Sequence, residues 1–477
     1  MRWDQMEKGD RYNILEGNLG VGLLRFGVPL SAGMALHAMF NVVDIAVVGN
    51  LPEGARALGV IALCDLLAMI GTVVSTGVGN AAAAIISRRL GAGDSSRAAQ
   101  ACWGSLCVLL AAGVFFGAVA LMWSGDILWV MGAKGWLHGQ ATKYLEVILG
   151  GVVTIFALLH VTSALRAAGH SATPTMLVFG ANVLNLILSV VLVYGPGEAP
   201  KIFAWGPPIA RFFSAPHLGI MGAAWGTVIA RGLVVLPGLV LVARDFSWPS
   251  LSSLVPDWKE VKQLWDIGWP STAQYAVRIA GILVLLAVIG HWYTTEDDQS
   301  ALSAMGICIR LDTIGLFMAL GWGSAAATFV GHNLGAGNYC RARRAGWLAA
   351  RICGVKLALV GIAYLLFADD LVPLFTDGDA VKEWCLSYLG FVAPVYGLVG
   401  VGAALSTALT GAGETMASFR IDSLVILGLQ TPLLLLVALL GAPLQVCFAA
   451  VAVGHLLTSG LYVYAFSRGR WRKRAVE

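Results

Sequence analysis

The stretch GNAAAAIISRRLGAGDSSRA (79–98) decides the architecture, because a close copy of it occurs in the second half of the chain. It aligns without gaps with GSAAATFVGHNLGAGNYCRA (323–342), at a shift of 244 residues. The same shift places RAAGH (166–170) over TGAGE (410–414). Apolar sequences often share Ala and Leu by chance, but an ungapped Leu-Gly-Ala-Gly followed by a matching Arg-Ala is not a chance match. The chain is therefore predicted to contain two related halves.

The composition is typical of a protein that lies in a membrane. Of the 477 residues, 58% are hydrophobic and 12% are charged, and the mean hydropathy is +0.78. Soluble domains carry about 25% charged residues. Apolar stretches long enough to cross roughly 30 Å of hydrocarbon recur along the whole chain and leave no soluble domain between them. We therefore expect neither an enzyme nor a nucleic-acid partner. Eight scattered cysteines without a CxxC pair predict no metal site.

The fold class predicted is an all-α polytopic membrane protein with twelve transmembrane helices. They cover residues 21–49, 58–86, 101–124, 145–168, 173–195, 217–243, 264–291, 300–330, 343–368, 387–410, 419–440 and 443–467. Six helices in each half give both halves the same topology, so pseudo-two-fold symmetry about an axis along the membrane normal relates two six-helix lobes. The predicted domains are an N-lobe at 1–245, a cytoplasmic linker at 246–262 and a C-lobe at 263–477.

The positions of the basic residues predict the orientation. Alternate connections are rich in Lys and Arg: Arg88, Arg89, Arg97, Arg166, Arg244, Lys259, Lys262, Arg341, Arg343, Arg344 and Arg420. The opposite connections are poor in both residues and include TTEDDQ (294–299) and a long loop rich in proline and aromatic residues (194–218). Because basic connections face the cytoplasm, we expect both termini there and the chain in the cytoplasmic (inner) membrane. We expect a monomer surrounded by the lipid bilayer.

One aspartate interrupts the first apolar helix, in FNVVDIAVVGN (40–50). A charged Asp at the centre of a membrane costs about 2.5 to 3.5 kcal/mol, and taking up a proton removes that cost. His37, Asn41 and Asp44 are spaced i, i+4, i+7, so they lie on one helical face, which we expect to border a cavity. His37 could relay protons to Asp44, or it could be a structural histidine.

A second polar stripe lies in the fifth helix, and one more hydroxyl lies in the sixth. The residues are Asn182, Asn185, Ser189 and Thr227. Together with Asp44 their oxygen atoms could hold a proton or a hard cation such as sodium, with sodium at Asp44 and Asn185. The alternative is that the Asn and Thr side chains form hydrogen bonds that hold the helices together.

Five motifs in order give the chain a resemblance to a known family. They are VDIAVVG in the first helix, SRRLGAGD after the second, LRAAG after the fourth, GIMGAAWGTVIAR (219–231) in the sixth and GHNLGAGN after the eighth. The chain resembles the MATE family, the multidrug and toxic compound extrusion transporters, over essentially its whole length. The resemblance implies a secondary active antiporter that exports organic cations or amphipathic drugs by alternating access. The coupling ion would be a proton or sodium.

The resemblance also implies roles for individual residues. Asp44 matches the first-helix aspartate that is a centre of cation or proton coupling in prokaryotic members. The fifth helix of the family often reads Asn, three residues, then Asp, whereas this chain has Asn185 and Ser189. A single carboxylate holds one proton well but binds sodium less tightly. The sequence therefore favours proton coupling.

The C-terminal half carries its own polar residues within apolar helices. Gln274, Arg278, Arg310 and Asp312 are predicted to line a substrate cavity. Counted from the cytoplasmic ends of their helices, Arg278 and Asp312 reach similar depth, which predicts an ion pair with either a packing or a substrate-linked role. Asp422 is predicted to lie at the membrane interface, and the position of Asp65 is left open.

Two other functions fit the same architecture. A flippase for a lipid-linked sugar or another anionic lipid would need a basic excess in its cavity, and Arg278 and Arg310 keep that reading open. A passive channel would need no titratable carboxylate. The Leu-Gly-Ala-Gly turns lack the lysine of a phosphate-binding loop, and no nucleotide-binding domain or other cofactor site is evident. Transport is therefore predicted to draw on an ion gradient.

Overall fold

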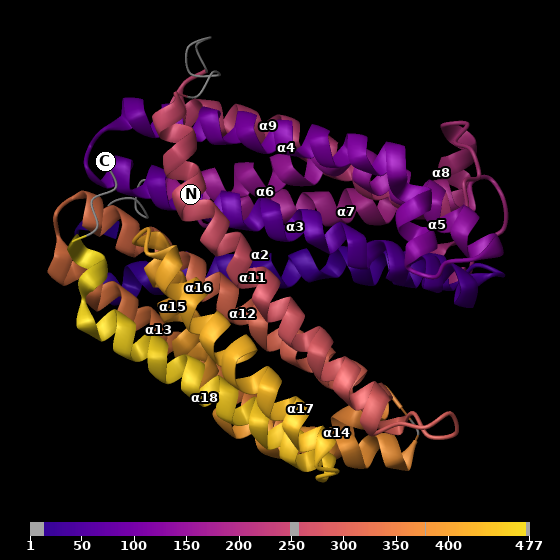
Figure 1. The fold of residues 1–477 in the computed structure, drawn as a ribbon. Coiled ribbons are helices and arrows are strands. Elements are labelled where there is room, and N and C mark those ends of the chain that lie inside the picture. The colour runs from indigo at the N-terminus through magenta and orange to yellow at the C-terminus, as the bar shows by residue number, and fades with distance from the viewer. Residues whose placement is uncertain (1–13, 249–256, 377, 474–477) are drawn as a thin grey trace. The chain divides into compact units, whose positions relative to one another are not determined.

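The computed structural model describes residues 14–248, 257–376 and 378–473. Within these ranges the chain is helical and contains no strand (Figure 1). Twelve helical spans are long and apolar enough to cross a membrane. The predicted fold class and number of spans are thus confirmed.

The first half supplies six spans, and one of them consists of two helices joined end to end. They are α2 (Leu19–Gly49), α3 (Gly54–Gly91), α4 (Ser95–Val130), α5 (Gly135–Gly150) with α6 (Val152–Ala167), α7 (Ala172–Tyr194) and α9 (Ile220–Phe246). The connection between α7 and α9 contains η1 (Lys201–Phe203) and α8 (Gly206–Phe212). Phe203 stacks on Tyr194 with ring centroids 5.8 Å apart, so this connection packs on the end of α7.

The second half supplies the other six spans. They are α11 (Trp258–Trp292), α12 (Ser300–Gly335), α13 (Tyr339–Leu371), α14 (Asp379–Val392) with η3 (Ala393–Val395) and α15 (Tyr396–Gly411), α16 (Thr415–Asp422) with η4 (Ser423–Gln430) and α17 (Thr431–Leu439), and α18 (Leu444–Arg468). Short turns η2 (Val372–Leu374) and η5 (Arg470–Lys473) follow α13 and α18. The segment η4 is π-helical, a rare form that is frequent at functional sites.

The internal repeat of the sequence is also a repeat of helix boundaries. The fourth and tenth spans run over Gly135–Ala167 and Asp379–Gly411, so both ends keep the shift of 244 residues. Both spans are interrupted at the same place, by Gly151 in the first half and by η3 in the second. The shift is lost only after α7, because the connection that contains α8 has no counterpart between α17 and α18.

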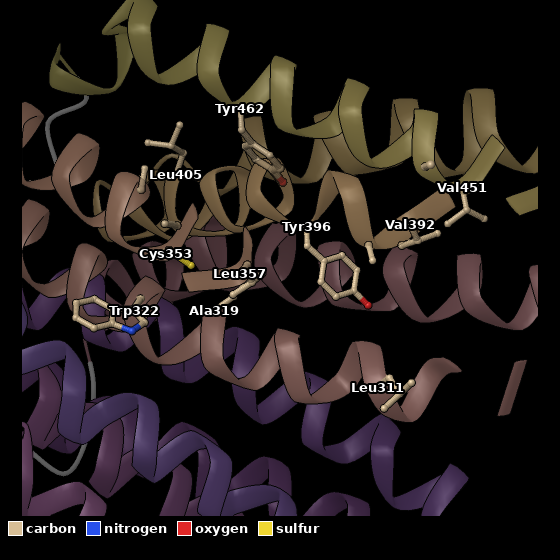
Figure 2. Packing of buried hydrophobic residues seen from close by; sticks show 14 of the residues in the cluster. Leu311, Ala319, Trp322, Cys353, Leu357, Val392, Tyr396, Leu405, Val451 and Tyr462 are labelled. Atoms are coloured by element: carbon tan, nitrogen blue, oxygen red, sulfur yellow. The ribbon is translucent and has the colours of Figure 1, made fainter. Parts of the chain in front are cut away.

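The chain forms two compact units that differ from the predicted lobes in membership. Unit 1 contains the described residues up to Ala32, Ala83–Asp94, and those from Trp265 onward, and unit 2 contains Gly33–Ala82 and Ser95–Leu264. The lobe boundary at 246–262 stays a prediction, although α11 already begins within it at Trp258. Each unit has its own buried apolar core. Figure 2 shows part of the unit 1 core, where Tyr396 and Tyr462 lie among aliphatic side chains.

Candidate functional site

Four of the residues predicted for ion coupling meet inside unit 2. Asp44 lies near the C-terminal end of α2 and is only 7% exposed. Asn185 Nδ2 donates a hydrogen bond to Asp44 Oδ1 at 3.3 Å, and Thr227 Oγ1 reaches Oδ2 at 3.0 Å. Ser189 Oγ lies 3.5 Å from Oδ1. The carboxylate is thus enclosed by one amide and two hydroxyls, from α7 and α9.

Small residues of α9 allow this close arrangement. A Cβ added to Gly222 would lie 2.5 Å from the backbone of α7 at Leu192 and Val193, and one added to Gly226 would lie 2.8 Å from the backbone nitrogen of Ser189. Glycines four residues apart let two helices in a membrane approach backbone to backbone. They bring Thr227 against the polar face of α7, where Asn185 and Ser189 lie.

The hydrogen atoms of this group leave room for one more proton. Thr227 Oγ1 contacts two oxygens, Asn185 Oδ1 at 2.9 Å and Asp44 Oδ2 at 3.0 Å. Ser189 Oγ likewise contacts Asn185 Oδ1 at 3.2 Å and Asp44 Oδ1 at 3.5 Å. Each hydroxyl has one hydrogen to donate, so two hydrogens serve four oxygen–oxygen contacts. A proton on Asp44 Oδ2 would donate to Thr227 and free the Thr227 hydrogen for Asn185. The same oxygens could also surround a cation.

Two further charged residues, Arg231 and Asp65, interact with the site, although the sequence assigned neither a role. Arg231 interacts electrostatically with Asp44 and with Asp65 of α3. Tyr144 of α5 interacts electrostatically with all three. The signal was present in the sequence, since Arg231 follows Thr227 by one helical turn. Asp65 could not be assigned, because sequence spacing does not say which face of α3 meets α2.

Asn182, which was also predicted for this site, does not join the group. Asn182 Nδ2 donates to the backbone oxygens of Leu36 in α2 and Val178 in its own helix, each at 2.9 Å. It therefore holds α2 against α7, as the packing alternative predicted, and no contact joins it to Asp44. The side chains of His37 and Asn41 lie outside the described part of the structure.

Unit 1 contains a cavity of about 260 Å³ among α11, α12, α15, η4 and α18. Its lining includes Arg278, Asp312, Tyr388, Tyr396, Asp422 and His455. Gln274 is not among the lining residues, but it donates to Asp422 Oδ2 at 2.9 Å and so supports the cavity wall. Arg310 is exposed and does not line this cavity, so its place in a substrate cavity stays a prediction.

The predicted ion pair between Arg278 and Asp312 is wrong. Arg278 Nε donates to Asp422 Oδ2 at 2.7 Å, and Tyr462 donates to the other Asp422 oxygen at 2.7 Å. Asp422 is fully buried rather than interfacial. Arg278 neutralises this enclosed carboxylate, and the depth count could not show that α16 faces α11.

Asp312 is held by neutral donors instead. Tyr388 Oη donates to one oxygen at 2.6 Å, and Tyr396 Oη donates to the other. Two phenols satisfy the carboxylate without a direct ion pair. The unit 1 cavity therefore combines an acid in an aromatic setting with a second acid that is neutralised by Arg278.

The described residues form twelve spans in two repeated halves, with carboxylates enclosed inside both units, and so define a polytopic membrane protein. The MatE family model matches residues 29–191 and 272–436, and the chain belongs to this family of transporters.

Individual relatives agree over most of their length. The chain is 26% identical to the probable multidrug resistance protein YpnP of Bacillus subtilis, covering 97% of this chain and 98% of that protein. It is 24% identical to the probable multidrug resistance protein NorM of Thermotoga maritima, over 95% of this chain and 93% of the relative. It is also 24% identical to an FAD transporter of Shewanella oneidensis, over 89% of each.

Solved structures share the fold. A multidrug resistance MATE family transporter in an outward-facing conformation matches with a TM-score of 0.84 at 21% identity, covering 97% of this chain and 98% of that chain. A transporter of the same superfamily from Pyrococcus furiosus, described as having a binding pocket of reverse polarity, matches with a TM-score of 0.83 at 22% identity, with the same coverage.

Proposed function

We propose that this protein is a secondary active antiporter that exports organic cations or amphipathic drugs in exchange for protons. The observation that carries the proposal is the enclosure of Asp44 by Asn185, Ser189 and Thr227, a group in which two hydroxyl hydrogens serve four oxygen–oxygen contacts and one added proton would supply a third. Membership in the MatE family and relatives named as multidrug resistance proteins support the export of small molecules.

The exchange follows from competition for one charge. With Asp44 ionised, its negative charge favours the binding of a cationic substrate. When a proton from the outer side neutralises Asp44, the counter-charge is lost and the group around Thr227 rearranges its hydrogen bonds. The substrate then leaves, and the proton dissociates on the inner side. Each ligand favours a state that the other does not share, which couples the two fluxes.

The chemistry of the group around Asp44 favours a proton over sodium. Asp44 is the only carboxylate among its four members, and Asn185, Ser189 and Thr227 are neutral. Sodium held by Asp44 and Asn185 is the alternative coupling ion. Hard cations prefer several oxygen ligands, and one carboxylate gives such a site little negative charge.

The coupling ion is identified by separate gradients. In proteoliposomes loaded with a fluorescent organic cation, we expect transport to respond to an imposed pH step in the absence of sodium. A sodium gradient at constant pH should leave the rate unchanged. Transport that requires the sodium gradient and ignores the pH step would overturn the assignment of the ion.

We also propose that the unit 1 cavity contributes to substrate binding. Asp312 offers a carboxylate between two tyrosine side chains, and apolar residues such as Ile282 and Leu316 complete the lining. A carboxylate among aromatic rings suits an organic cation with an apolar body. Among the described lining residues the charged groups are Arg278, Asp312 and Asp422, which gives no basic excess. This balance disfavours a flippase for an anionic lipid.

Replacement of Asp312 by Asn should weaken transport without abolishing it. The charge is removed, but the amide keeps one oxygen for a tyrosine hydroxyl. We expect the apparent affinity for a cationic substrate to fall about five- to tenfold, with a smaller effect on a neutral amphipathic substrate. Uptake measured for both substrates in the same vesicles tests this, and equal losses for the two would contradict the role.

We propose an inner-membrane location with both termini in the cytoplasm, a monomeric state, and two transport lobes at 1–245 and 263–477. The concentration of basic residues in alternate connections supports the orientation.

A further inference from the structure

The helices that hold Asp44 bring a second carboxylate and a guanidinium into the same interior. Arg231 follows Thr227 by four residues in α9, so their side chains lie on one face. Since Thr227 hydrogen-bonds to Asp44, Arg231 lies one turn beyond the carboxylate. Electrostatic interactions link Arg231 with both Asp44 and Asp65.

Counted from the ends of their helices, Asp65 and Arg231 lie at similar depth in unit 2. The ends of α2, α3, α7 and α9 meet in one core that contains Val47, Val60, Tyr194 and Ile220. From this end Asp65 lies about 16 Å along α3 and Arg231 about 16 Å along α9, at 1.5 Å per residue. Asp44 lies only about 8 Å from the end of α2 by the same measure. The second carboxylate is therefore deeper in the unit than the first.

The packing of α3 places Asp65 toward the interior of the unit. Its neighbour Cys64 is fully buried and donates from its thiol to the backbone oxygen of Ala141 in α5, at 3.4 Å. One turn further along α5, Tyr144 is buried and interacts electrostatically with Asp44, Asp65 and Arg231. Asp65 is itself half-buried and thus lies at the edge of the interior formed by α2, α3, α5 and α9.

The other titratable groups of the surrounding helices are engaged elsewhere or lie outside this group. Tyr194 of α7 donates to the backbone oxygen of Val47 at 2.7 Å. Glu146 of α5 accepts from Ser124 of α4 at 3.3 Å, and Lys143 is exposed. In the group itself, two carboxylates face one guanidinium and two neutral acids, Tyr144 and Cys64. With both carboxylates ionised it carries a net negative charge, so one bound proton makes it neutral.

We propose that Asp65 is a second proton-carrying residue of the transporter, and that Arg231 neutralises whichever of Asp44 and Asp65 is ionised. This inference rests on the proposed proton coupling at Asp44. In one neutral state Asp44 holds the proton and Arg231 balances Asp65. In the other, Asp65 holds the proton and Arg231 balances Asp44. A proton leaves Asp44 and arrives at Asp65 as the guanidinium changes its partner, so charge is conserved throughout.

The consequence is a step that moves the proton deeper while restoring the negative charge on Asp44. Burial of an unbalanced charge is costly, so the two neutral states are favoured over any state with both acids ionised or both protonated. The second carboxylate that other family members place at the position of Ser189 would in this chain be supplied by α3. Arg231 is a positioning residue in this scheme, because it acts through the acids.

Asp65→Asn tests the inference in reconstituted full-length protein. Arg231 is then left with Asp44 alone, which keeps Asp44 ionised and without a proton to exchange. We expect uptake driven by a pH gradient to fall at least about fivefold, while a fluorescent organic cation still binds. In weakly buffered detergent solution the wild type should release about one proton per substrate bound, and Asp65→Asn should release none.

The comparison variants separate this inference from the proposed function. Asp126→Asn changes an exposed acid of α4 in the same unit and should behave as the wild type. Asp65→Glu should retain uptake and proton release. If Asp65→Asn keeps wild-type uptake and proton release while Asp44→Asn is inactive, the role of Asp65 is overturned and the proton coupling at Asp44 stands. Wild-type behaviour of both variants would overturn the proton coupling as well. Loss of substrate binding would reveal a destabilised Asp65→Asn protein, and Asp65→Glu then decides the question. An Asp65→Glu protein that folds but is inactive would count against the inference.

Discussion

Replacing Asp44 by Asn is expected to abolish uptake driven by a pH gradient. The amide retains the hydrogen-bonding shape of the carboxylate but cannot titrate, so a folded protein should remain. The loss of a group that takes up and releases a proton typically costs about a hundredfold or more. Proteoliposome uptake of a fluorescent cation measures the effect, with thermal unfolding in detergent as the test of folding.

The control for this variant is an acid that takes no part in the group. Asp126→Asn removes one carboxylate from the same unit at an exposed position and should leave uptake unchanged. Efflux by Asp44→Asn at the wild-type rate, with a normal unfolding temperature, would refute the central role of Asp44.

Replacing Asp422 by Ala is expected to have the largest effect on stability. Arg278 would keep its charge inside unit 1 but lose the oxygen that lies 2.7 Å from its Nε atom. Gln274 and Tyr462 would lose the same partner. Removing one partner of a buried ion pair costs about 3 to 5 kcal/mol, because the other charge is left uncompensated. Thermal or denaturant unfolding of the detergent-solubilised protein should show this loss.

An exposed ion pair in the same unit provides the comparison. Lys382 Nζ lies 3.0 Å from Asp369 Oδ1, where the aspartate side chain is 77% exposed. Pairs of this kind contribute about 0 to 1 kcal/mol. Asp369→Ala should therefore change the unfolding free energy little, and equal losses for the two alanine variants would contradict the importance of burial.

Much of the architecture could be predicted from the sequence, because it depends on patterns along the chain. The spacing of apolar stretches gave the twelve spans, and the repeated Leu-Gly-Ala-Gly turn gave a shift that helix boundaries such as Gly91 and Gly335 obey. Asp44, Asn185, Ser189 and Thr227 were grouped correctly, since an acid in apolar surroundings requires polar neighbours at similar depth. A periodic pattern shows both the depth and the polar face of each of these helices.

The sequence could not predict which helix faces which. Arg278 and Asp312 share a depth, yet Arg278 pairs with Asp422, because depth along the membrane normal leaves the neighbouring helix undetermined. The eleventh span also changes to π-helix immediately after Asp422, and this alters the faces on which Ile426 and Gln430 lie. Counting at 3.6 residues per turn cannot anticipate such a change. The relation of Asp65 to Asp44 was missed for the same reason.

The number of protons released when substrate binds is the sharpest test of proton coupling at Asp44. The detergent-solubilised wild type is titrated with a fluorescent organic cation in weakly buffered solution, and the pH change is read with an indicator dye. We expect about one proton to be released per substrate bound by the wild type, and none by Asp44→Asn. Substrate binding by the wild type without any proton release would contradict proton coupling at Asp44.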